Sequence, residues 1–183
     1  MLLRFIAPLA QALGEQWRTG RITAAHEHFA TGVIRAFLNR AAKPYATVQD
    51  SPVLVVATPA GQLHELGVLL VAASAANLGW RVINLGAGLG AAEIAGAAGQ
   101  HQARAVALSI VYPADDRNLP GELVHLRELL PNTALVVGGR AMPAYRETLN
   151  RLGALQTLDL AELGTILDGL REPRDSAARS APR

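Results

Sequence analysis

Residues 51–67 read SPVLVVATPAGQLHELG and decide how the chain folds. The first part, Val53–Ala57, is a continuous apolar run of strand length, which is typical of a strand buried on both faces. A loop with Pro59 and Gly61 follows, and a helical pattern then extends from His64 to Leu78. An apolar strand followed by a helix is the repeating unit of a parallel sheet that helices cover on both sides.

The same alternation continues to the end of the folded region. Further strands are expected over Arg81–Leu85, Ala103–Ile110, Ala134–Val137 and Leu155–Thr157. Helices are expected over Ala91–Gln102, Gly121–Leu130, Pro143–Leu152 and Leu160–Leu170. The sequence therefore predicts an α/β fold with a five-stranded, parallel, doubly wound sheet of the flavodoxin or Rossmann-like kind.

Two helices are expected before the sheet. Apolar residues recur at helical spacing between Leu2 and Leu13, and a second helix is expected over about Thr23–Ala42. The pair Thr19-Gly20 separates the two helices, and Pro44 ends the second one. We therefore expect a partial helix bundle over residues 1–46, an α/β domain over 51–170 and a disordered tail over 171–183.

Composition narrows the classes of function. The chain has 183 residues, a net charge of +2 and no cysteine, which excludes disulfides, thiolate metal sites and cysteine nucleophiles. The segment 171–183 carries the whole net charge, so the body is neutral and direct DNA binding is not expected. No apolar run is long enough to span a membrane and no signal peptide is recognised, so a cytoplasmic protein is expected.

Candidate functional residues follow the strands, because open parallel sheets bind ligands beyond the carboxyl ends of their strands. His64 and Gly67 follow the first strand, although a lone histidine at this place is more often a local helix cap. The segment Gly86–Ala91 fits a loose dinucleotide pattern, but it follows the second strand and is interpreted as a turn. Ser109 ends the third strand and Gly138-Gly139 ends the fourth, and either pattern alone is ordinary turn chemistry.

The two N-terminal helices add a second group of candidates. Trp17 ends the first helix, and Glu27-His28 lies in the first turns of the second, so an antiparallel pair would bring them to one side. Spacing alone would favour a core tryptophan and a solvated Glu–His pair, with His26 facing solvent. There is no G-x-S-x-G nucleophile elbow and no H-E-x-x-H zinc pattern, so a hydrolase of either kind is unsupported.

Taken together, these segments resemble a cobalamin-binding domain. The family pattern is a D/E-x-H-x-x-G segment after the first strand, S-x-L/V after the third and G-G after the fourth. Here the corresponding segments are Gln62–Gly67, Ser109-Ile110-Val111 and Gly138-Gly139. The preceding W-x9-E-H pattern, seen as Trp17 and Glu27-His28, resembles light-responsive regulators of the CarH/LitR type and the stand-alone antirepressors of the AerR type.

The resemblance implies a role for each of these residues. His64 would be the lower axial ligand of cobalt in the base-off, His-on mode, and the displaced nucleotide tail would enter a slot beside the sheet. The residues that would line this slot are Gly67, Ser109, Val111, Gly138 and Gly139. Trp17, Glu27 and His28 would form a lid over the upper face, with His28 as a candidate ligand there. The implied cofactor is adenosylcobalamin first, with methyl- or hydroxocobalamin as alternatives.

Three departures from the family pattern stand out. Gln62 replaces the usual acidic residue, so it could accept a hydrogen bond from the His64 imidazole but carries no charge. Arg18 follows the motif tryptophan where CarH-type proteins have a histidine that captures cobalt after illumination, so His28 or His26 would have to substitute, or water would bind. The chain also begins about two helices short of the usual four-helix bundle and has no winged-helix DNA-binding domain, which suggests a truncated or a naturally short form.

The functional prediction is a cobalamin-binding sensor, not an enzyme, that signals by changing protein contacts or oligomerisation. Light or the identity of the upper ligand would be the input, and a homo-oligomer and a transcription-factor partner are expected. The alternative is a corrinoid methyl carrier for methyltransferases, which would use His64 but would not need Trp17 or Glu27-His28. A cobalamin-dependent mutase subunit would need a substrate barrel, which a chain of this length cannot contain. A phosphoacceptor module would need an aspartate at the end of the first strand, where this chain has Thr58.

Overall fold

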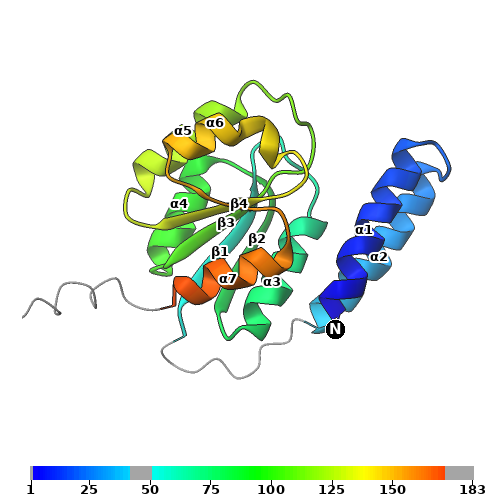
Figure 1. Cartoon of the computed structure of the whole chain (residues 1–183), viewed down its shortest axis with the longest axis horizontal. Coiled ribbons are helices and arrows are strands. Elements are labelled where there is room, and N and C mark those ends of the chain that lie inside the picture. The colour runs from blue at the N-terminus through cyan, green and yellow to red at the C-terminus, as the bar shows by residue number, and fades with distance from the viewer. Residues whose placement is uncertain (1, 42–50, 172–183) are drawn as a thin grey trace, which may run out of the picture.

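The computed structural model describes residues 2–41 and 51–171, and a five-stranded parallel sheet forms its centre (Figure 1). The strand order is β2-β1-β3-β4-β5, and all neighbouring strands are parallel. The strands are β1 Val53–Pro59, β2 Arg81–Leu89, β3 Ala105–Ser109, β4 Ala134–Gly138 and β5 Leu155–Thr157. The predicted fold class is confirmed.

Helices cover both faces of this sheet (Figure 1). They are α3 Leu66–Asn77, α4 Ala91–Gln100, α5 Leu119–Leu129, α6 Arg146–Arg151 and α7 Leu160–Gly169, with a 3-10 turn η1 at Met142–Tyr145. The helix expected over Pro143–Leu152 is therefore divided into η1 and α6. No described helix has the length and apolar character needed to cross a membrane.

Two boundaries differ from the sequence prediction in ways that matter for the site. Helix α3 begins at Leu66, so His64 lies in the preceding loop and not in the helix. Strand β2 continues to Leu89, so the expected turn at Gly86–Ala91 is mostly strand. It continues because Ala57 pairs with Gly86 and Pro59 with Leu89, across register shifts that positive φ angles at Gly86 and Gly88 accommodate.

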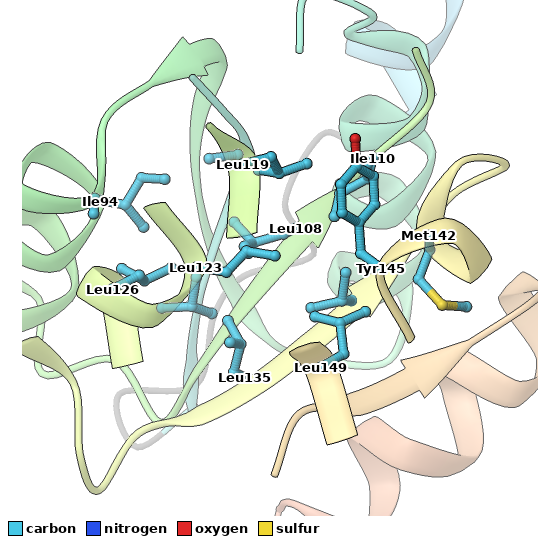
Figure 2. Close-up of a cluster of buried hydrophobic side chains, with 14 of the residues drawn as sticks. Ile94, Leu108, Ile110, Leu119, Leu123, Leu126, Leu135, Met142, Tyr145 and Leu149 are labelled. Atoms are coloured by element: carbon cyan, nitrogen blue, oxygen red, sulfur yellow. The ribbon is translucent and has the colours of Figure 1, made fainter. Parts of the chain in front are cut away.

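Two apolar clusters hold the sheet between its helices. The strands contribute alternate residues to opposite faces, so Val55, Val106 and Val137 meet α4, α5 and α6 on one side. Leu54, Val56 and Val136 meet α3 and α7 on the other side. Figure 2 shows the first cluster, in which the Tyr145 ring packs among leucines while its hydroxyl points out of the cluster. That hydroxyl accepts a 2.9 Å hydrogen bond from Asp116 N–H, so the cluster also fixes the loop after β3.

The N-terminal helices α1 Leu2–Arg18 and α2 Ala24–Ala41 form an antiparallel pair beside α3 (Figure 1). A third, smaller cluster joins Ile34 and Leu38 of α2 to Leu69, Leu70 and Ala73 of α3. This contact places the helical pair next to the loop that carries His64. The division into segments 1–46, 51–170 and 171–183 stays a prediction, because residues 42–50 and the tail from 172 lie outside the described residues.

We expect Leu38 to anchor the helical pair. Its side chain is almost completely buried, so Leu38→Ala should lower the free energy of unfolding by about 2–5 kcal/mol. The neighbouring Val33 on the same helix is mostly exposed, and Val33→Ala should change it by no more than about 0.5 kcal/mol. Urea unfolding followed by circular dichroism measures both, and equal effects would contradict the assigned contact.

Candidate functional site

The candidate residues that follow β1, β3 and β4 gather at one end of the sheet. These strands are neighbours in the strand order, and Ser109 at the end of β3 pairs with Gly138 at the end of β4. Because the strands are parallel, the loops with His64, Val111 and Gly139 leave the sheet at the same edge. The strand order thus brings these loops to one end of the sheet, and their role in binding a ligand stays a prediction.

Helix α3 packs directly against the end of β3 at Gly67. A Cβ atom on Gly67 would collide with Ser109 Oγ and would lie 3.1 Å from Ser109 Cβ. Only a residue without a side chain allows this approach. The predicted slot is therefore closed at this point, and a ligand tail that enters between α3 and β3 must move the start of α3 away from Ser109.

The pair Gly138-Gly139 is packed just as tightly. A Cβ atom on Gly138 would lie 3.0 Å from Thr157 Cγ2. Gly139 has a φ of +105°, and a Cβ atom there would press on the backbone of Ile110, 2.8 Å from its nitrogen. The two glycines let the ends of β3, β4 and β5 approach without side chains between them.

Gln62 is buried, and all the hydrogen-bond partners of its side-chain amide lie in the segment after β3. Its Oε1 accepts hydrogen bonds from Val111 N–H and Tyr112 N–H, both at 3.0 Å, and its Nε2 donates to the Pro113 carbonyl at 3.0 Å. Both lone pairs of Oε1 are thereby occupied. The expectation that Gln62 accepts a hydrogen bond from His64 is wrong for this structure, because its acceptor is committed to the other loop.

Thr58 is a site residue whose contribution the sequence did not reveal. Its side chain is fully buried, and Oγ1 donates to the Gln62 carbonyl and accepts from Gly88 N–H at 2.9 Å. Thr58 thus joins the loop after β1 to the extended end of β2, and Gln62 joins the same loop to the segment after β3. Together they fix the loop from which His64 projects.

His64 itself is exposed and faces Tyr112. The two ring centroids are 6.0 Å apart with an interplanar angle of 81°, which is an edge-to-face contact. Within the described part of the chain, neither nitrogen of His64 makes a hydrogen bond. An exposed imidazole with unengaged nitrogens is suited to bind a metal brought by a ligand.

The residues of the predicted lid lie at the turn between α1 and α2. Trp17 is 46% exposed, so it is not a core tryptophan. Glu27 accepts from Thr31 Oγ1 at 2.7 Å and lies 3.0 Å from His28 Nδ1, while the His28 side chain is 86% exposed. His26 is exposed, as predicted, and contacts Thr23 through Nδ1. This arrangement leaves the Trp17 and His28 rings available to a ligand.

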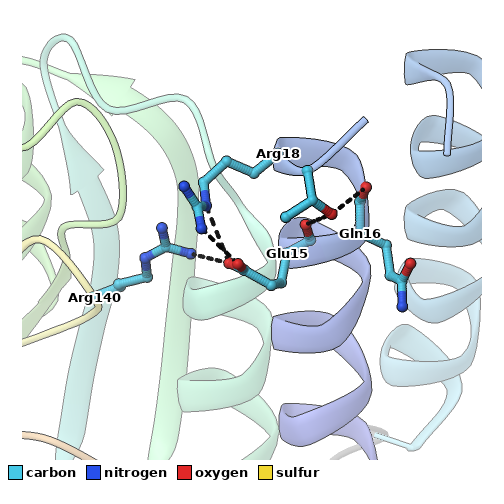
Figure 3. A network of polar contacts seen from close by, with 5 residues as sticks. Glu15, Gln16, Arg18 and Arg140 are labelled. Carbon is cyan, nitrogen blue, oxygen red and sulfur yellow. Dashed lines mark hydrogen bonds and ion pairs between the residues drawn. The ribbon is translucent and has the colours of Figure 1, made fainter. Parts of the chain in front are cut away.

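Ion pairs connect the helical pair to the loops at the end of the sheet. Glu15 near the end of α1 lies 3.8 Å from Arg140, which directly follows Gly139, and it also binds Arg18 (Figure 3). The hydrogen bond from Arg18, helped by the nearby charges of Arg140 and Arg21, lowers the pKa of the Glu15 carboxyl. On α2, Arg35 binds Glu65 at 3.1 Å, and Glu65 directly follows His64.

These residues fit a large ligand that carries a metal. His64 offers an unengaged imidazole, and Gly67, Gly138 and Gly139 let α3 and the strand ends pack closely without side chains between them. A cavity of about 190 Å³ lies next to the His64 loop, lined by Glu65, Val68, Leu69, Asn84, Leu85 and Gly86. Among the described residues no group of three or more acidic, histidine or cysteine side chains could hold a metal ion alone. A single exposed imidazole can supply one ligand to a metal whose other ligands come from a cofactor.

Comparison with known proteins points to one family. The model of the B12 binding domain matches residues 52–157. The HTH-type transcriptional repressor CarA of Myxococcus xanthus is 29% identical over 171 residues, which cover 93% of this chain and 58% of CarA. The HTH-type transcriptional repressor CarH of the same organism is 31% identical over 150 residues, 80% of this chain and 49% of CarH. The chain thus spans about half the length of these relatives.

Solved structures share the fold at lower identity. A cobalamin-binding protein from Desulfitobacterium hafniense DCB-2 aligns with a TM-score of 0.56 at 20% identity, over 90% of this chain and 80% of that one. The monomethylamine corrinoid protein of Methanosarcina barkeri aligns with a TM-score of 0.65 at 15% identity, over 88% and 78%. The methanol:cobalamin methyltransferase complex MtaBC of the same organism aligns at 0.58 and 15%, over 92% and 67%.

The close packing at Gly139 leads to a stability prediction. Gly139→Ala combines a left-handed φ with a collision against Ile110 backbone, and should cost about 3 kcal/mol or more. Gly153 also has a positive φ of 61° but open space around it, so Gly153→Ala should cost only about 1–2 kcal/mol. Urea unfolding of both variants tests this, and equal losses would mean that Gly139 is required only for its backbone angle.

Proposed function

This chain belongs to the family of B12-binding domains, and we propose that it is a cobalamin-binding sensor module that passes the state of its cofactor to protein partners. The observation that carries the proposal is the exposed His64 imidazole, which has no hydrogen-bond partner among the described residues and lies in the loop just before Gly67, which packs against Ser109. The similarity to two transcriptional repressors over most of the chain supports a regulatory role.

His64 would be the lower axial ligand of the cobalt. The tail of the cofactor would enter between α3 and the sheet, along Gly67, Ser109, Val111, Gly138 and Gly139, once α3 moves away from Ser109. Thr58 and Gln62 would keep the His64 loop in place during this change, because their hydrogen bonds are buried. Adenosylcobalamin is the form we propose first, and when bound it supplies a cobalt–carbon bond that light can break.

The helical pair would act as the lid that senses the upper ligand. Trp17, Glu27 and His28 lie at its α1–α2 turn, and His28 would be a candidate ligand on the upper face. The helical pair makes ion pairs with Glu65 and Arg140. Both pairs are partly exposed, so each stabilises the contact by no more than about 1 kcal/mol. Because these pairs flank His64 and Gly139, occupancy of the site would shift both, and such weak links allow two positions of the helices.

The output would be a change of protein contacts. Phe29, Val33 and Phe37 are exposed at successive turns of α2, and Phe5 and Leu9 are exposed on α1. Such an apolar surface favours association, so we propose a homo-oligomer and a transcription-factor partner, with no direct contact to DNA from the neutral body. The alternative is a corrinoid methyl carrier, favoured by the shared fold of the monomethylamine corrinoid protein.

Visible absorption tests cobalamin binding directly. The protein mixed with adenosyl-, methyl- or hydroxocobalamin in the dark and then desalted should retain colour with a His-on spectrum. His64→Ala should lose that spectrum, whereas His125→Ala, which removes an exposed histidine from α5, should keep it. Loss of all colour from the unaltered protein on desalting would refute the proposal.

Light and oligomeric state test the sensor role. Light scattering coupled to size-exclusion chromatography should give different masses for the adenosylcobalamin complex in the dark and after illumination. Phe29→Ser should reduce the larger species, because the Phe29 ring is 76% exposed on the apolar surface of α2. Identical masses, with transfer of a methyl group from a methyltransferase to the bound cob(I)alamin, would instead favour the methyl carrier.

A further inference from the structure

The contact between His64 and Tyr112 stands out because it joins an exposed imidazole to an aromatic ring from the loop after β3. Its nitrogens make no hydrogen bond in the described part of the chain, and the Tyr112 ring meets it edge to face at a centroid distance of 6.0 Å. A metal-binding histidine is usually held by a hydrogen bond from its second nitrogen. Here the contact between His64 and another side chain that the structure shows is with an aromatic ring.

Tyr112 owes its place to Gln62. Two of the three hydrogen bonds of the Gln62 amide end on the N–H groups of Val111 and Tyr112, and the third ends on the Pro113 carbonyl. The Tyr112 ring itself is 64% exposed, so burial does not hold it. The buried amide fixes the backbone, and the backbone presents the ring to His64.

The chemistry of position 62 explains why an amide is needed there. A carboxylate could accept from the Val111 and Tyr112 N–H groups, but it could not donate to the Pro113 carbonyl. It would remove the 3.0 Å hydrogen bond to that carbonyl, leave it only the 3.5 Å contact from the Tyr145 hydroxyl, and place two acceptors against each other. Gln62 thus binds the loop after β3 and does not bind His64. The residue of that loop that contacts His64 is Tyr112.

We propose that Tyr112 is a positioning residue for His64, which holds the imidazole in the orientation that receives the cobalt, and that Gln62 acts through Tyr112. This inference rests on the proposed cobalamin-binding function. It assigns Tyr112 no bond to the metal. It also accounts for the missing acidic residue, because the orienting contact comes from a ring on a neighbouring strand end.

The first test needs no cofactor. In the ligand-free protein, proton NMR signals of the His64 ring should carry a ring-current shift from Tyr112, assigned with His64→Ala. Tyr112→Ala should abolish the shift and Tyr112→Phe should keep it. The thermal midpoint should stay unchanged in both, since the ring is mostly exposed. A His64 signal that is the same in Tyr112→Ala and the unaltered protein would overturn the proposal.

The second test follows the bond to cobalt. Adenosylcobalamin titrated in the dark should give a His-on fraction whose equilibrium constant falls about 2- to 12-fold in Tyr112→Ala, which is the range of an aromatic pair. Tyr112→Phe should match the unaltered protein, and Gln62→Glu should move in the direction of Tyr112→Ala. In this proposal the ring of Tyr112, and not its hydroxyl, orients His64. A Tyr112→Phe variant whose His-on equilibrium constant falls as far as that of Tyr112→Ala would contradict the proposal.

The two levels of the proposal fail in different ways. A His-on spectrum that Tyr112→Ala leaves unchanged would overturn the role of Tyr112 and leave cobalamin binding intact. Absence of a His-on spectrum from the unaltered protein would overturn cobalamin binding through His64, and the role of Tyr112 with it.

Discussion

The side chain of Gln62 is only 1% exposed, and a buried polar group without a partner costs roughly 1–3 kcal/mol. Its three hydrogen bonds to residues 111–113 satisfy this demand, and Thr58 connects the same loop to Gly88 on β2. These bonds tie the loop after β1 to β2 and to the loop after β3, which the apolar cluster around Ile110 and Tyr145 also holds. The loop that carries His64 makes a turn in which Gln62 N–H donates to the Pro59 carbonyl, and α3 begins after it at Leu66.

Close packing of glycines sets the second constraint. Gly67 lets α3 touch Ser109, and Gly138 and Gly139 let the last three strands approach. A chain with side chains at these positions could not close in this way, and under the proposed function this chain would have to open here to admit the tail of the cofactor. The hydrogen bonds of Thr58 and Gln62 and the close contacts of the glycines therefore have different roles. The bonds hold the loop of His64, and in the proposed function the start of α3 at Gly67 is the part that would move.

The helical pair is attached more weakly than the helices of the α/β domain. A small cluster around Leu38 and two partly exposed ion pairs join it to α3, Glu65 and Arg140. Weak attachment next to a ligand site is a useful property in a sensor, since a change of a few kcal/mol in ligand contacts is enough to shift a population. The exposed rings of Phe5 and Phe29 on the same helices offer a surface on which that shift could be detected.

The sequence by itself determined the alternation of strands and helices, the parallel sheet and the edge at which His64, Ser109 and Gly138-Gly139 meet. These follow from apolar periodicity and from the residues that end strands, which are local properties. Only the tertiary structure decided which atoms Gln62 binds, that β2 continues to Leu89, that Gly67 rests on Ser109, and that Tyr112 faces His64. Each of these joins residues distant in the chain, about 50 positions apart for Gln62 and its partners. Local pattern cannot specify such contacts, because they exist only once the loops of separate strands have been brought to the same edge.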